Sequence, residues 1–162
     1  MAQQELEITY CEHGLLMAVL GPVCIGLWKT KPTRELFLIQ KEHLAVAVAH
    51  TPGKVAFLCV VTSEASPPDE PERAASSAMI DGHGSKLAAV ACVIEGTGFR
   101  AAITRTVLSG ITAVIRSPSP IRFFESVELA TPWLAQRVGR AAVVALPGHF
   151  ALARTRVSPV AA

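Results

Sequence analysis

The chain has 162 residues, of which 51% are apolar and 17% are charged, and its formal net charge is +2 at pH 7. This length predicts one domain, and this composition excludes a disordered polyelectrolyte. A net charge so close to zero gives no global field that would indicate a nucleic-acid-binding protein.

The first residues, MAQQELEITYCEHG, are polar and acidic, which is the opposite of the basic-then-apolar order of a signal peptide. No apolar run approaches the roughly 18 uninterrupted residues of a membrane span. The four cysteines have no CxxC spacing, and Cys59 and Cys92 lie within apolar runs, where a reduced cysteine behaves as a small hydrophobe. We therefore expect a soluble, cytoplasmic protein with reduced thiols and no transmembrane segment.

The first 28 residues predict a β-hairpin and one further extended segment. Apolar and polar residues alternate over Leu6–Tyr10, as in a half-exposed strand whose even-numbered residues share one side. Glu12-His13-Gly14 predicts a turn, and the apolar run Leu15–Leu20 predicts a second strand that Gly21-Pro22 ends. Val23–Trp28 is then either a third short strand or an extended lead into the next element.

A helix and a buried strand are predicted next. Thr33 is a candidate N-cap for a helix over Arg34–His50. The first half of this segment has helical spacing, while Ala45–Ala49 alternates and is also compatible with a strand. Thr51-Pro52-Gly53 ends the element in either case. The apolar run VAFLCVVT, at Val55–Thr62, predicts a central strand.

The middle of the chain predicts a loop, a short helix and the buried βα unit around which the fold is organised. Ser63–Glu72 contains three prolines and four acidic residues and predicts an exposed loop. Arg73–Ile80 predicts a short helix that Asp81-Gly82-His83-Gly84 closes. Leu87–Ile94 is a continuous apolar run, typical of a strand buried on both faces. Thr97–Arg116 has apolar residues at helical spacing and predicts a long amphipathic helix.

After that helix, the stretch Ser117-Pro118-Ser119-Pro120 predicts a stop. Ile121–Phe124 predicts a short strand, and Ser126 is the candidate N-cap of a last helix that Gly139 ends. Arg140–Ala162 is apolar but broken by a Pro-Gly pair. This segment is compatible with an added strand, with a segment that docks on a partner or with a disordered tail.

Strands and helices in this order predict an α/β fold. The leading hairpin followed by βα units gives a mixed β-sheet of about four to six strands, with helices packed mainly on one face. In this interpretation residues 1–139 form the domain, and residues 140–162 form a C-terminal extension of uncertain order.

Four stretches of the chain resemble the STAS-like superfamily of bacterial anti-sigma-factor antagonists, and specifically small bacterial STAS/SEC14-type domains. They are ELEITYCEHGLLMAVLGPV, KVAFLCVVT, LAAVACVIEGTGFRAAITRTVLSGI and IRFFESVELATPWL, and the resemblance as a whole extends roughly from Leu6 to Gly139. The resemblance implies a small α/β domain that works through protein–protein contacts in a bacterial regulatory pathway, and in some members is switched by phosphorylation.

The phosphorylated members of this family carry the modified serine in an Asp-Ser-Ser-Gly-like turn. The corresponding interval here, Thr62–Ser77, contains no such turn. Its candidate phosphorylation sites are Ser63, Ser66, Ser76 and Ser77, although none has the family's neighbours. The departure puts a kinase-switched role in doubt and leaves the predicted fold unchanged.

Two short patterns contain residue types that occur in binding sites. Gly96-Thr97-Gly98 can present backbone amides to a phosphate, but it lacks the remaining residues of the known phosphate-binding loops, and a plain tight turn is favoured. Cys11, His13 and Cys24 have metal-binding side chains, but their spacing fits no standard zinc pattern. Buried thiols and a turn histidine are favoured, so we expect no metal and no cofactor.

One pattern was weighed as a catalytic site. Asp81, His83 and Ser85 lie together, but three residues this close in an open turn rarely acquire the geometry of a nucleophile and its base. The sequence also has no GxSxG motif. We therefore do not expect an enzyme.

Candidate interaction residues come from the arginines and the aromatic pair of the second half. The arginines that can form a basic patch around the predicted long helix are Arg100, Arg105, Arg116 and Arg122. Phe123 and Phe124 are adjacent, and in a strand they point to opposite faces, so one of them lies under a helix or on an exposed surface. These residues are our candidates for contact with a partner.

The function that these observations favour is a non-enzymatic interaction module that binds a protein partner or forms a homodimer. A mean hydropathy of +0.40 is high for a monomer, which must hide its apolar surface. The alternative is a carrier of a small ligand, a lipid or a nucleotide, as the SEC14 side of the resemblance implies. An exposed apolar patch favours the module, and a deep apolar pocket favours the carrier.

Overall fold

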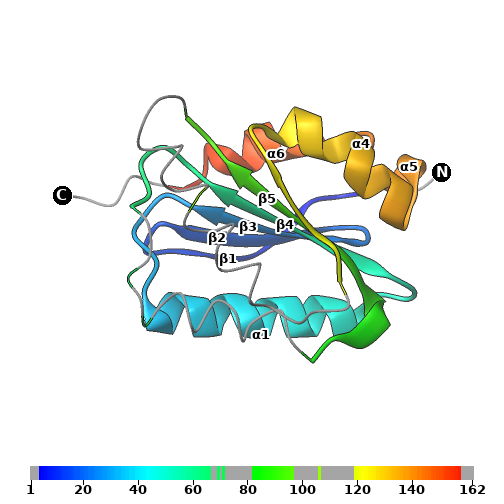
Figure 1. The fold of residues 1–162 in the computed structure, drawn as a ribbon, viewed down its shortest axis with the longest axis horizontal. Coiled ribbons are helices and arrows are strands. Elements are labelled where there is room, and N and C mark those ends of the chain that lie inside the picture. Colours follow the sequence, from blue (N-terminus) through cyan, green and yellow to red (C-terminus); the bar gives the residue numbers. More distant parts are fainter. Residues whose placement is uncertain are drawn as a thin grey trace.

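The computed structural model describes residues 4–66, 69, 71, 82–96, 106 and 119–157. Within them the chain forms a single six-stranded sheet with helices on both sides (Figure 1). The strands are β1 (Glu7–Glu12), β2 (Leu15–Leu20), β3 (Val23–Trp28), β4 (Val55–Val61), β5 (Leu87–Ile94) and β6 (Ile121–Phe124). The helical elements are α1 (Arg34–His50), the 3₁₀ turn η1 (Gly84–Lys86), α4 (Val127–Val138), α5 (Arg140–Val143) and α6 (Leu146–Arg154).

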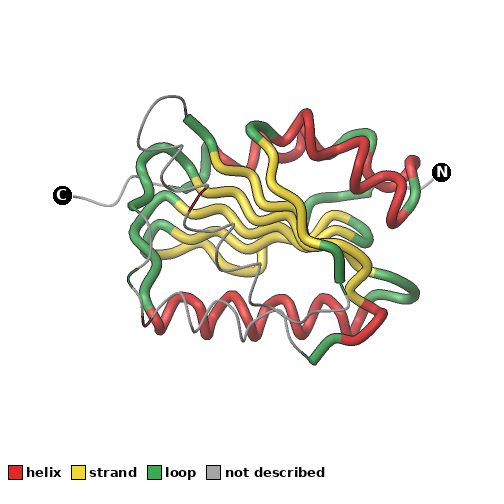
Figure 2. Tube along the Cα trace, viewed as in Figure 1, coloured by secondary structure: helices red, strands yellow, loops and turns green. Residues whose placement is uncertain are grey.

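The sheet is mixed, and its strands lie in the order in which they occur along the chain. β1, β2 and β3 are antiparallel neighbours, whereas β3, β4, β5 and β6 are parallel. Figure 2 shows the strands as one twisted layer between two layers of helix. The predicted α/β class and mixed sheet are therefore confirmed. Of the four α-helices within the described residues, α4, α5 and α6 share one face and α1 covers the other.

The leading segment forms two hairpins. His13 and Gly14 link β1 to β2 with φ values of 53° and 78°, as a two-residue turn with a left-handed backbone requires. β2 pairs with β3 over its whole length, from Leu15 opposite Trp28 to Leu20 opposite Val23. Of the two interpretations of Val23–Trp28, the strand is therefore the correct one.

The predicted alternation of the first strand fails at one residue. The pairing of β1 with β2 shifts between Ile8 and Tyr10, which leaves Thr9 in a bulge. Ile8 consequently packs on the core under α4 and α6, whereas Tyr10 packs on the core under α1. Because one extra residue reverses the side-chain alternation, Tyr10 does not share a side with Leu6 and Ile8 as the sequence predicted.

The two faces of the sheet bury two separate cores. The face under α1 buries Trp28 of β3 and Phe57 of β4 against Phe37 and Leu44 of the helix. The opposite face buries β2, β3, β4 and β5 against the three helices of the second half. The α4 residues buried there are Val127, Ala130, Trp133 and Leu134, which recur at helical spacing. This double coverage explains why β3, β4 and β5 are apolar at almost every position.

A glycine in the middle of β3 makes room for a polar contact inside the α1 core. Gln40 is 1% exposed, and its Oε1 accepts a hydrogen bond of 2.7 Å from Trp28 Nε1. A Cβ atom on Gly26 would lie 2.8 Å from that Oε1 and 3.3 Å from Met17 Sδ. Gly26 is therefore needed for the approach of Gln40 to the sheet.

We expect Gly26→Ala to lower the free energy of unfolding by about 1–3 kcal/mol, because the new methyl group displaces Gln40 from Trp28. Chemical denaturation followed by tryptophan fluorescence measures this change. Gly148→Ala is the matched control: a Cβ there meets no atom within 4 Å, and alanine favours the helix α6. An unchanged stability for Gly26→Ala would show that Gln40 does not need this space.

The two helix N-caps that the sequence predicts are confirmed. The side chain of Thr33 accepts a hydrogen bond from the Leu36 amide at 3.3 Å. The side chain of Ser126 accepts one from the Leu129 amide at 3.2 Å. α1 runs as one helix to His50, so its alternating last turns do not form a strand.

The segment after Gly139, for which the sequence predicted no single structure, is helical as far as Arg154. Val143, Leu146, Phe150, Ala153 and Val157 are all buried in the same core as α4. α5 and α6 thereby extend the layer of helix over the sheet (Figure 1). The predicted helices at residues 73–80 and 97–116 lie outside the described residues, apart from Thr106.

Candidate functional site

The carboxyl ends of parallel strands are where α/β sheets commonly bind ligands, and here the end of α6 contacts the residues that follow β3 and β5. Lys29, which follows β3, donates through Nζ to the carbonyl oxygens of Arg154 (3.4 Å) and Val157 (3.1 Å). Glu95, which follows β5, forms an ion pair with Arg154. Positive charge at the end of a helix also complements its dipole. The charged groups at this edge thus fasten the end of α6 to the sheet.

The thiols of the sheet do not have the properties of nucleophiles. Loss of solvation raises the pKa of Cys24 to about 12 and that of Cys92 to about 12. Cys59 is the Cα partner of Cys92 in the neighbouring strand, and desolvation, with a smaller contribution from Cys92, raises its pKa well above the ordinary value. A thiol that stays protonated at neutral pH is a poor nucleophile and a poor metal ligand.

The metal-binding alternative for Cys11, His13 and Cys24 is not supported. Cys11 packs against the core under α4 and α6, whereas Cys24 lies in the core under α1, so the sheet separates the two thiols. In the part of the chain that the structure describes, no group of three or more His, Cys, Asp or Glu side chains is placed to hold a metal ion.

The two remaining patterns are only partly within the described residues. Gly96 has a φ of 106°, a conformation that glycine adopts readily, while Thr97 and Gly98 lie outside. His83 and Ser85 lie before and within η1, and Asp81 lies outside the described residues.

The predicted contact residues fall into two groups. Arg100, Arg105 and Arg116 lie outside the described residues, as do the candidate phosphorylation sites Ser76 and Ser77. Of the other candidate sites in that interval, Ser63 is exposed and Ser66 is partly buried. The structure therefore places only Arg122, Phe123 and Phe124 on a described surface.

The aromatic pair lies on β6, the outermost strand of the described sheet, and its two members face opposite ways. Phe124 packs under α4 with its ring centroid 5.6 Å from that of Trp133. Phe123 is the neighbour of Cys92 in the adjacent strand, on the alternate side of the sheet. Of the two, Phe124 is the one that lies beneath a helix.

A row of two aromatic side chains with an arginine at each end joins β6 to α4. The guanidinium carbon of Arg122 lies 5.3 Å from the ring centroid of Phe124, which contacts Trp133. The guanidinium carbon of Arg137 lies 5.3 Å from the centroid of Trp133 on the other side. Cation–π attraction holds both arginines in place while they stay exposed. The i, i+2 spacing on a strand and the i, i+4 spacing on a helix could have indicated each arginine–aromatic pair in the sequence, but not that the two pairs meet.

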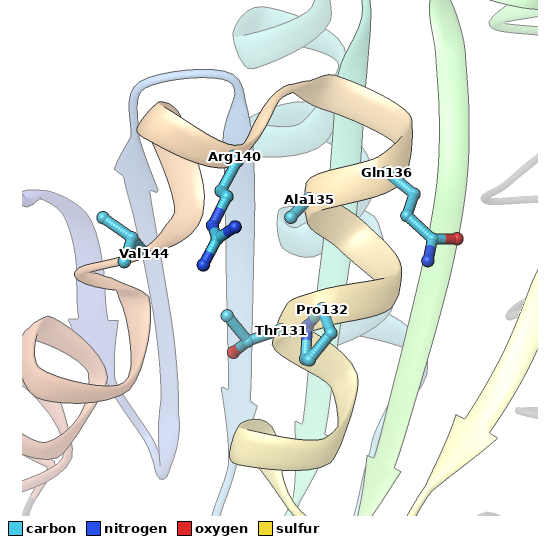
Figure 3. A pocket seen from close by; sticks show the side chains of 6 residues that line it. All are labelled: Thr131, Pro132, Ala135, Gln136, Arg140 and Val144. Carbon is cyan, nitrogen blue, oxygen red and sulfur yellow. The ribbon is translucent and has the colours of Figure 1, made fainter.

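A pocket of about 520 Å³ lies on the other flank of α4, between this helix and α5. Its lining consists of Thr131, Pro132, Ala135, Gln136, Arg140 and Val144 (Figure 3). Figure 3 shows Arg140 reaching from the start of α5 into the space beside α4, on the side of Thr131, while Gln136 projects from the opposite flank of the helix. Val144 also lines the pocket, and its side chain is largely exposed. The sequence did not indicate this pocket, because it depends on how α5 folds back beside α4.

We call this surface the α4 face. It consists of Arg122, Phe124, Glu125, Glu128, Leu129, Thr131, Pro132, Trp133, Ala135, Gln136, Arg137, Arg140 and Val144. Two of its aliphatic side chains are strongly exposed, Leu129 by 59% and Val144 by 67%. Exposed aliphatic groups beside buried aromatic ones are typical of a binding surface.

The charges of the α4 face are divided between its two ends. Glu125 and Glu128 lie at the start of α4, and Arg137 and Arg140 lie at its end. All four side chains are exposed. None of them forms an ion pair with another described residue. Exposed charges of this kind can pair with those of a partner.

Two further pockets open at the surface beside the last turns of α1. One, of about 590 Å³, lies between α1 and β1 and includes His43, whose Nδ1 is 2.9 Å from Thr9 Oγ1. The other, of about 600 Å³, is lined by Lys54 and Arg137 among others. Both open to solvent and include charged side chains in their lining, unlike the deep apolar pocket that a lipid carrier requires.

Comparison of the chain with protein-family models, with curated proteins and with solved structures finds no match. Among the described residues, no helix is both long enough and apolar enough to cross a membrane. The function has to be argued from the surface itself.

Proposed function

We propose that this chain is a non-enzymatic protein-interaction module, of the STAS-like kind that its sequence resembles, and that it binds a protein partner through the α4 face. The observation that carries the proposal is that the Arg122–Phe124–Trp133–Arg137 row on one flank of α4, the exposed Leu129 on the helix and the exposed Val144 on its other flank all lie in the same helical layer. Arginine is enriched among the residues that contribute most to the binding energy of protein interfaces, and exposed aliphatic groups gain from burial.

The partner that fits this surface is an apolar one that carries acidic side chains. Arg122, Arg137 and Arg140 place three cations around the exposed aliphatic groups, and carboxylates are their natural counterparts. Arginine held against an aromatic ring loses little conformational freedom when it pairs, which favours a contact there.

The carrier alternative has less support. The end of α6 contacts the carboxyl edge of the sheet, where a ligand of an α/β domain commonly binds, and Lys29 and Glu95 are engaged in holding it. The pockets described above lie at the surface. A protein–protein contact uses such a surface directly, without displacing any described element.

We expect Leu129→Asp combined with Val144→Asp to weaken partner binding at least about tenfold, because both charges are buried on binding. Capture from cell extract identifies the partner, and calorimetry with the two purified proteins measures the affinity. Both side chains are exposed, so the fold is expected to be unaffected, with a stability change within about 0.5 kcal/mol.

The matched control is Leu38→Asp combined with Val46→Asp on α1, where the two side chains are 53% and 57% exposed on the opposite side of the sheet. This variant is expected to bind like the unmodified chain. Equal loss of binding in the two variants would contradict the assignment of the α4 face, as would unchanged affinity in the first.

A further inference from the structure

We infer that the partner of the α4 face is a second copy of this chain, with α4 packed antiparallel against α4 of the other copy. This inference rests on the proposed function and names its partner. It is carried by the distribution of charge along α4. Acidic side chains stand at the start of α4 and arginines at its end, with no charged residue of the helix between Glu128 and Arg137.

An antiparallel pair of such helices brings opposite charges together at both ends. α4 has 12 residues and is therefore about 18 Å long. With the two-fold axis near Pro132 and Ala135, Glu125 and Glu128 of one copy face Arg137 and Arg140 of the other. The same pairing recurs at the opposite end by symmetry, as a two-fold interface requires.

The middle of the face allows two helices to approach closely. Pro132 lies at the centre of the outer side of α4, with Ala135 beside it and Thr131 on the same flank. The hydroxyl of Thr131 donates to the carbonyl of Val127 at 2.8 Å, so this polar group is already satisfied and does not resist burial. Small side chains at the centre leave the aliphatic groups Leu129 and Val144 to supply buried apolar area on the flanks.

Self-association through the exposed edge of the sheet at β1, the alternative to α4, is disfavoured by charge. β1 is the other outer strand of the described sheet, and an antiparallel pair of β1 strands from two copies would set Glu7 against Glu12. Like charges directly opposite each other destabilise such a pair, and the bulge at Thr9 interrupts it further. Self-association through α4 meets neither obstacle.

The charge pattern of α4 also stabilises the helix on its own, because acidic groups favour its start and basic groups its end. Charge pairing between copies has a consequence that the dipole effect within one helix lacks. Two variants with opposite charge changes can bind each other even where neither binds itself. The charge-reversed variants below separate the two effects. Loss of the helix effect changes thermal stability, whereas loss of pairing changes the mass of the assembly.

The test uses two variants of the full chain, Glu125→Lys with Glu128→Lys, and Arg137→Glu with Arg140→Glu. In each variant alone, both ends of the face carry the same sign, so the dissociation constant of the dimer is expected to rise at least about tenfold. When the two variants are mixed, each end again meets its opposite, and a heterodimer is expected. Native mass spectrometry resolves this heterodimer by mass, and circular dichroism confirms that each variant is folded.

The inference is overturned if the mixture contains no heterodimer, or if either variant alone dimerises like the unmodified chain. If the unmodified chain is monomeric, but binds a different protein and the Leu129→Asp with Val144→Asp variant does not, this inference is overturned and the proposed function stands. A monomeric chain with no partner that depends on the α4 face overturns both.

Discussion

A chain that ends at Gly139 is expected not to fold. Removing residues 140–162 takes away Val143, Leu146, Phe150 and Val157, all of which are buried against the sheet and α4. The loss exposes the apolar residues of β2, β3, β4 and β5 that these side chains cover, and a domain of this size has only about 5–15 kcal/mol of stability to lose. Circular dichroism and gel filtration of the truncated chain are expected to show an unfolded or aggregated protein.

Single substitutions in α6 give a quantitative version of this prediction. Phe150 is 4% exposed, and Phe150→Ala is expected to lower the free energy of unfolding by about 3–5 kcal/mol, measured by urea denaturation. Leu152, in the same helix, is 69% exposed, so Leu152→Ala should change it by less than about 0.5 kcal/mol. If the chain that ends at Gly139 has native-like spectra and unfolds cooperatively, the segment that contains α6 is not required for folding.

Stability is expected to fall as the pH rises above about 9, because the unfolded chain ionises thiols that the fold keeps protonated. Burial raises the pKa of Cys24 from 9.0 to about 12, so between these values the unfolded state binds fewer protons than the folded state. The free energy of unfolding therefore decreases with pH in this window, by about 1.4 kcal/mol per pH unit for one thiol. Below pH 9 the Cys24 thiol is protonated in both the folded and the unfolded state, so its full contribution to the free energy of unfolding is present.

Urea denaturation at intervals from pH 8 to pH 11 measures the slope. Lysine and tyrosine side chains also titrate at high pH, so the informative quantity is the difference from Cys24→Ala, in which all other groups are retained. The variant is expected to have a shallower slope, by about 1.4 kcal/mol per pH unit. Equal slopes in the two proteins would mean that the Cys24 thiol is not desolvated in the fold.

Local patterns in the sequence predicted most of the described strands and helices. Leu87–Ile94 and Ile121–Phe124 have the predicted bounds, and Thr33 and Ser126 cap helices as predicted. These features depend on a few neighbouring residues, and so they can be read from the chain directly. Tyr10 was misplaced because the bulge at Thr9 arises from pairing with β2, which no local pattern encodes.

The candidate site could be predicted only in fragments. Arg122 and Phe124 were predicted contact residues, but their alignment with Trp133 and Arg137 depends on how α4 crosses β6. The pocket beside Arg140 depends on the reversal of the chain at Gly139, whose φ of 104° favours glycine. Residues that meet through tertiary packing have no fixed spacing in the sequence, so periodicity could not group them.

Sedimentation equilibrium of the unmodified chain, over a wide range of protein concentration and at low and high salt, tests the central claim most directly. If the α4 face is self-complementary, the chain forms a reversible dimer of twice the chain mass. Because exposed charges pair at both ends of the contact, the dimer is expected to weaken as the salt concentration rises. A single species with the mass of one chain at every concentration and salt would contradict the claim.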